Sequence, residues 1–253
     1  MEKLKTVLSL KCHFLLKKLF MNDANRESEN LFDIEKRVIT HADTQFEMTY
    51  RSNCCLCCKL KKLKSEQEQI PVVLEDLTPA NKLLVLDLDE TLVHCSFHPT
   101  DYYDFCISII IDEVSYDVYI QKRPYVDQFL AECFKHFFVV IFTASLPQYA
   151  NPIIDVLCPH LPQSQRLFRE SCTFCEGLFV KDLTIFKAPL ERIIIVDNNP
   201  CSFLMHPANA ILSLTWEGDR NDWELRDYIL PLLKQCENVK DVRKVLAENK
   251  RNT

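Results

Sequence analysis

Two aspartates separated by one residue follow an aliphatic run in the segment LLVLDLDETLVH, which extends from Leu83 to His94. Residues two apart on an extended chain point the same way, so the carboxylates of Asp87 and Asp89 can reach one reacting centre. One carboxylate of such a pair can attack as a nucleophile, while the other donates a proton to the leaving group and later activates water. The simpler alternative is that each aspartate closes a turn or caps a helix, as aspartates at strand ends often do.

Two further apolar runs also end in polar side chains. The run VVIFTAS reaches Thr143, and the run IIIVDNNP reaches Asp197 and Asn198. Because ligands of open parallel sheets bind beyond the carboxyl ends of the strands, we expect these side chains around one crevice with Asp87 and Asp89. Such oxygen ligands suit Mg²⁺, which would offset the repulsion between the carboxylates and hold the oxygens of a phosphoryl group.

The elements that must position these side chains alternate along the chain after residue 70. Sequence patterns predict strands at 82–87, 105–111, 115–120, 137–142 and 192–196, and helices at 125–136, 146–157, 221–235 and 238–248. Fully apolar strands that alternate with helices indicate an α/β fold with a parallel sheet covered on both faces. Two adjacent strand-like runs within 102–120 predict an inserted β-hairpin.

Composition limits the other possibilities. The chain has 253 residues, of which 47% are hydrophobic and 26% charged, as in ordinary soluble globular proteins. A net charge of -6 argues against general nucleic-acid binding, and no apolar window is long enough to predict a transmembrane helix. With only two glycines, the chain has no Gly-rich phosphate loop. Thirteen scattered cysteines suit reduced thiols in a cytoplasmic or nuclear protein.

The segment DLDETLVH resembles the signature of the aspartate-based phosphatases of the haloacid dehalogenase superfamily. More narrowly, the chain resembles the branch that dephosphorylates the C-terminal domain of RNA polymerase II and related phosphoproteins. The resemblance extends from about residue 80 to about residue 246 and includes VYIQKRPYVDQFL, IFTASLPQYANPIID, LFRESCTF, FVKDL, IIIVDNNP and HPANAI. It implies a Rossmann-like parallel sheet with a short β-hairpin insert and no large cap domain.

The resemblance also implies roles for individual residues. Asp87 would be the nucleophile that forms an aspartyl-phosphate, and Asp89 would be the general acid and base. Thr143 and Lys181 would bind the phosphoryl oxygens. Mg²⁺ would be held by Asp87, by the backbone carbonyl of Asp89 and by Asn198, and Asp197 would support the site. Arg169 matches a basic residue that lies near the phosphate pocket in the family.

Each of these residues has a simpler interpretation. Lys181 could be a solvated surface lysine, and Arg169 could form an ion pair with its neighbour Glu170. We expect Thr91 to cap a helix that follows the first strand. We expect His94 and His206 to pack or form hydrogen bonds rather than to bind a metal.

The resemblance further implies an apolar pocket that binds a proline or apolar residue near the phosphoserine of the substrate. Its residues would be Phe97, Ile109, Ile111, Val118, Leu146 and Tyr149. The alternative for these positions is ordinary core packing. Tyr125 stands where the family often has Gly or His, which leaves the identity of the substrate open.

A composition change near residue 70 divides the chain. We predict an N-terminal extension at 1–70, partly helical or disordered, and a phosphatase domain at 71–250. The segment CCLCCKLKKLK places Cys54, Cys55, Cys57 and Cys58 beside four lysines. That combination suits S-acylation with electrostatic attachment to a membrane surface. Zinc binding is the alternative, although these cysteines are too crowded to surround one ion unaided.

The sequence therefore predicts a Mg²⁺-dependent protein serine/threonine phosphatase whose substrate is the C-terminal domain of RNA polymerase II or a related phosphoprotein. One alternative is a catalytically silent import-receptor-like scaffold, but such scaffolds usually lack one or both motif aspartates. Another is a phosphatase of small molecules or nucleic-acid ends. An open site without a large cap favours a macromolecular substrate.

Overall fold

The computed structural model describes residues 81–249 apart from 112, 113 and 176, together with 72, 74, 77 and 78. The predicted extension at 1–70, including Cys54, Cys55, Cys57 and Cys58, lies outside the described residues. None of the helices in the described part of the chain is long and apolar enough to cross a membrane.

A five-stranded parallel sheet forms the centre of the domain, in the order β10-β9-β1-β5-β6. Its strands are β1 (Leu83–Leu86), β5 (Phe138–Phe142), β6 (Arg166–Leu167), β9 (Ile193–Asp197) and β10 (Ala210–Leu212). Every residue of β1, β5 and β9 is buried, which is why these strands are apolar throughout rather than alternating. The prediction of a Rossmann-like α/β fold with a parallel sheet is confirmed.

The register of the three central strands sets the position of the residues that follow them. Leu86 at the end of β1 pairs with Ile141 of β5 and with Val196 of β9. The backbone N–H of Asp87 donates to the carbonyl of Val196 at 2.9 Å. Because the strands end at the same level, the polar residues after them lie along one edge of the sheet.

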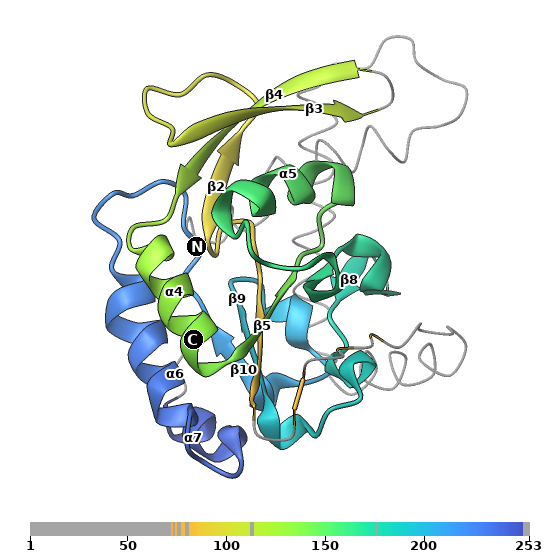
Figure 1. Cartoon of the computed structure of the whole chain (residues 1–253), viewed down its shortest axis with the longest axis vertical. Coiled ribbons are helices and arrows are strands. Elements are labelled where there is room, and N and C mark those ends of the chain that lie inside the picture. Colours follow the sequence, from red (N-terminus) through yellow and green to blue (C-terminus); the bar gives the residue numbers. More distant parts are fainter. Residues whose placement is uncertain are drawn as a thin grey trace. The chain divides into compact units, whose positions relative to one another are not determined.

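The longer helices follow the strands as predicted. They are α4 (Val126–His136), α5 (Pro147–Leu157), α6 (Leu230–Cys236) and α7 (Val242–Glu248), and α6 continues from one turn of π-helix, η8 (Leu225–Ile229). Figure 1 shows α4, α6 and α7 gathered along one side of the parallel sheet. Helix α4 begins after Tyr125, whose φ of 72° lies in the left-handed region that favours glycine. A tyrosine in this conformation is strained relative to glycine.

The insert between β1 and α4 is larger than the predicted hairpin. It is a three-stranded antiparallel sheet in the order β2-β4-β3, formed by β2 (Val93–Ser96), β3 (Phe105–Ile111) and β4 (Val114–Lys122). Strand β2 was missed because its four residues carry too little pattern and depend on pairing with β4. Figure 1 shows this sheet standing over α5.

No helix follows β1, so the prediction that Thr91 caps one is wrong. Instead the chain turns tightly, with the N–H groups of Leu92 and Val93 both directed to the carbonyl of Leu88 at 2.9 and 3.2 Å. Glu90 adopts a φ of 61° within this turn. The turn reverses the chain into β2 and keeps Asp87 and Asp89 at the edge of the sheet.

The segment between α5 and α6 consists mainly of short elements. They are η2 (Gln163–Gln165), η3 (Arg169–Ser171), β7 (Thr173–Cys175), β8 (Leu178–Val180), η4 (Leu183–Phe186), η5 (Leu190–Arg192), η6 (Pro200–Phe203) and η7 (Pro207–Asn209). Strands β7 and β8 pair as an antiparallel hairpin that leads directly to Lys181. Alternate side chains of β1, β5 and β9 pack against η4 and Phe203, which closes one face of the sheet. Burial of each such aliphatic side chain stabilises the fold by about 1.5–3 kcal/mol.

A buried arginine ties the insert to the sheet. Arg123, which follows β4, is 1% exposed. Its guanidinium donates to both carboxylate oxygens of Asp222 at 2.8 and 2.9 Å, to the carbonyl of Thr91 at 3.1 Å and to the hydroxyl of Ser213 at 2.9 Å. The bidentate pair compensates the buried charge and fixes the turn after β1 against the segment after β10.

We predict that Arg123→Ala lowers the free energy of unfolding by about 3 kcal/mol, because it leaves Asp222 without its buried partner. Denaturant unfolding followed by circular dichroism measures the loss. The exposed pair of Arg226 and Asp227 provides the control, and Arg226→Ala should change stability little. Equal effects of the two substitutions would contradict a structural role specific to Arg123.

Candidate active site

Lys181 lies at the centre of the polar edge of the sheet. Its ammonium donates to Oδ1 of Asp87 and to Oδ2 of Asp197, both at 2.6 Å. The side chain is 1% exposed, so the alternative of a solvated surface lysine is wrong. Its backbone N–H donates to the carbonyl of Ser202 at 2.7 Å, which fixes the residue after the β7–β8 hairpin.

The charges around Lys181 decide its protonation state. Burial alone would lower the pKa of the ammonium, but the carboxylates of Asp197 and Asp87 outweigh burial and raise its pKa above the usual value. Lys181 therefore stays charged at neutral pH and offsets the repulsion between the two carboxylates. Without it, two carboxylates would be buried close together with no compensating charge.

Asp87 has a donor on each carboxylate oxygen. Lys181 holds Oδ1, and the hydroxyl of Thr91 donates to Oδ2 at 2.9 Å. The same hydroxyl lies 3.4 Å from the amide oxygen of Asn198. The amide nitrogen of Asn198 donates to the hydroxyl of Thr215 at 3.2 Å, so the amide oxygen is the atom that faces Asp87. Thr91 thus orients Asp87 rather than capping a helix.

Asp89 points away from Lys181, toward the segment that follows β5. Tyr149 donates its hydroxyl to Oδ1 at 2.6 Å, and Ser145 donates to Oδ2 at 2.8 Å. The Thr143 hydroxyl lies 3.4 Å from Oδ2 and accepts the backbone N–H of Ser145 at 3.0 Å. Burial raises the pKa of Asp89 to about 6, against the opposing hydrogen bond from Tyr149. The two motif aspartates therefore stand in different environments, one beside a cation and one among hydroxyls.

The remaining polar groups fit a magnesium ion. Asp197 uses Oδ2 for Lys181, and its Oδ1 accepts the backbone N–H of Asn199 at 2.8 Å, so this carboxylate supports the site from behind. The oxygens of Asp87 and Asn198 converge on the hydroxyl of Thr91. Within the described ranges, no group of three or more His, Cys, Asp or Glu side chains could hold a metal by itself. One carboxylate and one amide oxygen match the small protein contribution that Mg²⁺ usually receives.

Arg169 lies beside the loop after β5. Its Nε donates to the carbonyl of Ala144 at 2.7 Å, and its backbone N–H donates to the carbonyl of Ser145 at 3.1 Å. The guanidinium stands 5.0 Å from the centre of the Phe179 ring on β8. This residue therefore braces the loop that carries the hydroxyl groups around Asp89.

The residues predicted to form an apolar pocket lie between the insert and α5. Phe97 is partly exposed and stacks on Tyr149, with ring centres 6.4 Å apart. Ile109 and Val118 of the insert sheet are buried, whereas Leu146 at the start of α5 is partly exposed. Ile111 ends β3, and its side chain lies outside the described part of the chain.

The two histidines make hydrogen bonds, as predicted. Nδ1 of His94 lies 2.7 Å from Oε2 of Glu90, and Nε2 of His206 lies 2.8 Å from Oδ1 of Asp182. The second pair is buried, and its aspartate directly follows Lys181 in the chain. These contacts stabilise the turn after β1 and the loop after β8.

Sequence reasoning missed three hydroxyl groups that touch the site residues. Thr91 orients Asp87, Ser145 holds Asp89, and Thr215 orients Asn198. The hydroxyl of Tyr149 was also missed, because that residue was considered only for its ring. The segment TASLPQY could have signalled the contacts of Asp89, since Thr143, Ser145 and Tyr149 all follow the buried strand β5 within seven residues.

Residues 82–243 match the family described as NLI interacting factor-like phosphatase. The probable C-terminal domain small phosphatase of Dictyostelium discoideum is 48% identical over 171 residues, which are 68% of this chain and 56% of that protein. CTD small phosphatase-like protein 1 of Caenorhabditis elegans is 47% identical over 161 residues, which are 64% of this chain and 33% of that protein. This chain thus spans about half or less of the length of these two relatives.

A human relative matches over more of its length. The carboxy-terminal domain RNA polymerase II polypeptide A small phosphatase 1 of Homo sapiens is 40% identical over 214 residues, which cover 77% of this chain and 82% of that protein. Among solved structures, that of the fission yeast RNA polymerase II CTD phosphatase Fcp1-R271A bound to beryllium fluoride aligns with a TM-score of 0.48 at 16% identity, over 77% of this chain and 57% of that chain.

We predict that Asp89→Asn raises the free energy of unfolding of the metal-free protein by about 1 kcal/mol at pH 7. A carboxyl with a folded-state pKa near 6 and an unfolded value near 4 is harder to ionise in the folded state, so its charge lowers stability. The full difference corresponds to about 3 kcal/mol, which partial exposure of Asp89 reduces. The gain should be complete above pH 6 and absent below pH 4, where both states are protonated.

Denaturant unfolding in the presence of a chelator, at a series of pH values, measures this difference. Asp117→Asn, at an exposed position of the insert sheet, is the matched control and should show no such pH-dependent gain. A loss of stability in Asp89→Asn at every pH would contradict the prediction.

Proposed function

The chain belongs to the NLI interacting factor-like phosphatase family, and we propose that it is a Mg²⁺-dependent protein serine/threonine phosphatase that acts through an aspartyl-phosphate. The observation that carries this proposal is the separation of the two motif aspartates. Asp87 lies beside the Lys181 ammonium, whereas Asp89 lies among hydroxyl groups and its own pKa is raised. One carboxylate is thereby suited to nucleophilic attack and the other to proton transfer.

The first half-reaction transfers the phosphoryl group to the protein. A carboxylate oxygen of Asp87 forms a bond to phosphorus as the bond from phosphorus to the seryl or threonyl oxygen breaks. Asp89, protonated at the start of the step, gives its proton to the departing oxygen, which leaves as the free hydroxyl. The charge of Lys181 and the hydroxyl of Thr143 would stabilise the phosphoryl oxygens, because fixed donors interact most strongly with the charge that develops there.

The second half-reaction restores the protein. Asp89, now a carboxylate, accepts a proton from water as the water oxygen attacks phosphorus. The bond between phosphorus and Asp87 breaks, and inorganic phosphate and the original carboxylate are formed. Two hydrogen bonds to Asp89 keep the same carboxyl in reach for both proton transfers.

Mg²⁺ would be held by the carboxylate of Asp87, the amide oxygen of Asn198 and the backbone carbonyl of Asp89. When bound, it supplies positive charge that neutralises and orients the phosphoryl oxygens. Asp197 contributes by holding Lys181 in place, and the hydroxyls of Thr91 and Thr215 orient the side chains of Asp87 and Asn198.

A phosphoprotein is the substrate class that we propose, with the C-terminal domain of RNA polymerase II or a related phosphoprotein as its representative. The names of the relatives support this class. The partly exposed side chains of Phe97 and Leu146 beside the site could contact the residues around a phosphoserine. Arg169, in η3 beside the loop after β5, would support the phosphate. We propose a cytoplasmic or nuclear location, with membrane attachment through the cysteine cluster at Cys54–Cys58 as a prediction still to be tested.

We predict that the purified chain hydrolyses 4-nitrophenyl phosphate with Mg²⁺ and not with a chelator. Asp87→Asn should lower kcat/KM at least about 1,000-fold, because the nucleophile is removed. Asp117→Asn on the insert sheet makes the same chemical change at an exposed position and should retain activity. A folded chain that binds Mg²⁺ and shows no Asp87-dependent turnover would contradict the proposal and favour a catalytically silent scaffold.

The substrate class requires its own test. Phosphoserine and phosphothreonine peptides should be hydrolysed with higher kcat/KM than sugar phosphates or 5′-phosphorylated oligonucleotides. Release of inorganic phosphate measures all of them on one scale. Equal or higher kcat/KM for the small molecules would contradict a phosphoprotein substrate while leaving the aspartyl-phosphate chemistry in place.

A further inference from the structure

The Asp89 carboxylate is held on both sides by one short segment of the chain. Between the end of β5 and the first turn of α5, Ser145 donates to Oδ2 at 2.8 Å and Tyr149 donates to Oδ1 at 2.6 Å. Each oxygen therefore has its own donor, and the shorter bond comes from the tyrosine. This arrangement fixes the rotation of the carboxylate about its side-chain bonds.

Tyr149 is itself rigidly placed at the start of α5. Pro147 occupies the first turn of that helix, where its fixed φ favours the helical conformation. The backbone N–H of Tyr149 donates to the carbonyl of Leu146 at 3.1 Å. The residue is only 5% exposed, so the position of its hydroxyl depends on the position of the helix.

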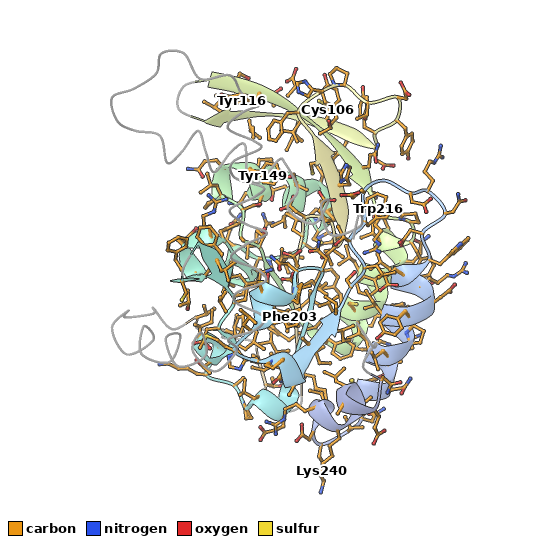
Figure 2. The ribbon with its side chains drawn as sticks, turned by 180° about the vertical axis from the view of Figure 1, so that it is seen from behind. Cys106, Tyr116, Tyr149, Phe203, Trp216 and Lys240 are labelled. Carbon is orange, nitrogen blue, oxygen red and sulfur yellow. The ribbon has the colours of Figure 1, made fainter. Side chains whose placement is uncertain are left out.

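The ring of Tyr149 also contacts the insert. It stacks on Phe97, with ring centres 6.4 Å apart and planes inclined by 27°. The Phe97 ring in turn meets Tyr116 of β4 edge-on at 6.3 Å. Figure 2 shows Tyr149 on α5, beneath the insert sheet that carries Tyr116. Tyr149 therefore links the insert sheet, through Phe97, to the carboxylate of Asp89.

The hydroxyl of Tyr149 acts as a donor in this contact. Burial, followed by the charge of Asp89, raises the pKa of the phenol well above its ordinary value. The phenol therefore gives a hydrogen bond to the carboxylate, with 2.6 Å between the two oxygens.

We propose that Tyr149 is a positioning residue for proton transfer: its hydroxyl holds the Asp89 carboxyl at the site of the departing oxygen, and its ring couples that position to the insert sheet. This inference rests on the proposed function and deepens it. It assigns to Tyr149 a role distinct from lining an apolar pocket, because the hydroxyl and not the ring makes the contact with Asp89.

A positioning role predicts a dependence on the leaving group. A basic leaving group must receive a proton as it departs, so hydrolysis of its substrate slows when the acid is displaced. General acid catalysis typically raises a rate by about 10²–10⁴. An acidic leaving group departs as an anion and needs little protonation. Phenyl phosphate and 4-nitrophenyl phosphate differ in this respect while sharing the same ring, and both lack the peptide that could contact Phe97.

The test compares kcat/KM of Tyr149→Phe and wild type on these two substrates. We expect about a 10-fold or larger loss on phenyl phosphate and less than about a 3-fold loss on 4-nitrophenyl phosphate. Thermal unfolding of both proteins shows whether the variant is folded. Ser145→Ala removes the donor to the other oxygen and should shift the ratio in the same direction, so it carries the test if Tyr149→Phe does not fold.

Tyr116→Phe is the matched control. It removes the same hydroxyl group from a tyrosine that touches Phe97 from the insert side, and it should leave the ratio between the two substrates unchanged. Equal losses on both substrates in Tyr149→Phe would indicate a general structural effect and overturn the proposal, and so would the absence of any loss. Wild-type protein without Asp87-dependent turnover of either substrate would instead mark the failure of the proposed function.

Discussion

The buried ammonium of Lys181 is the interaction on which the site depends. It stands 2.6 Å from an oxygen of Asp87 and 2.6 Å from an oxygen of Asp197, two carboxylates at the ends of neighbouring parallel strands. Removing this charge would leave two buried carboxylates to repel each other at the end of β1 and β9. Two features of the surrounding chain fix the position of Lys181. The residue directly follows the β7–β8 hairpin, and its backbone N–H donates to the carbonyl of Ser202.

With Asp87 held by Lys181, Asp89 is free to serve a different purpose. The turn after β1 directs the two side chains to different neighbours, one toward β8 and one toward the segment after β5. The hydroxyls around Asp89 supply hydrogen bonds but no positive charge, so burial keeps its pKa raised. The different roles of Asp87 and Asp89 thus follow from the different side chains that surround each carboxylate. Helix α5 and the insert sheet meet at Tyr149 and complete this second environment.

Much of the fold could be predicted because its central strands are unbroken apolar runs. The apolar sequences of β1, β5 and β9 predict buried parallel strands, and the polar residues at the ends of these strands predict the edge where the site lies. Strand β2 could not be predicted, because four residues of mixed polarity become a strand only by pairing with β4. The same reasoning explains the error at Thr91: a helix cap and a turn residue carry the same local signal, and tertiary contacts with Arg123 and Asp87 decide between them. The hydrogen bond between Tyr149 and Asp89 could not be predicted from the sequence either, because it depends on how α5 packs beneath the insert sheet.

The most direct test of the central claim is to trap the covalent intermediate. The chain would be mixed with a phosphoserine peptide and Mg²⁺, quenched, and treated with borohydride, which reduces an acyl phosphate to an alcohol. Mass spectrometry of the peptide that contains Leu83 to His94 then identifies the modified residue. The account predicts that Asp87 alone is converted, to homoserine, and that the product is absent without substrate. Turnover with no reduced residue, or with the modification at another position, would contradict a mechanism through Asp87.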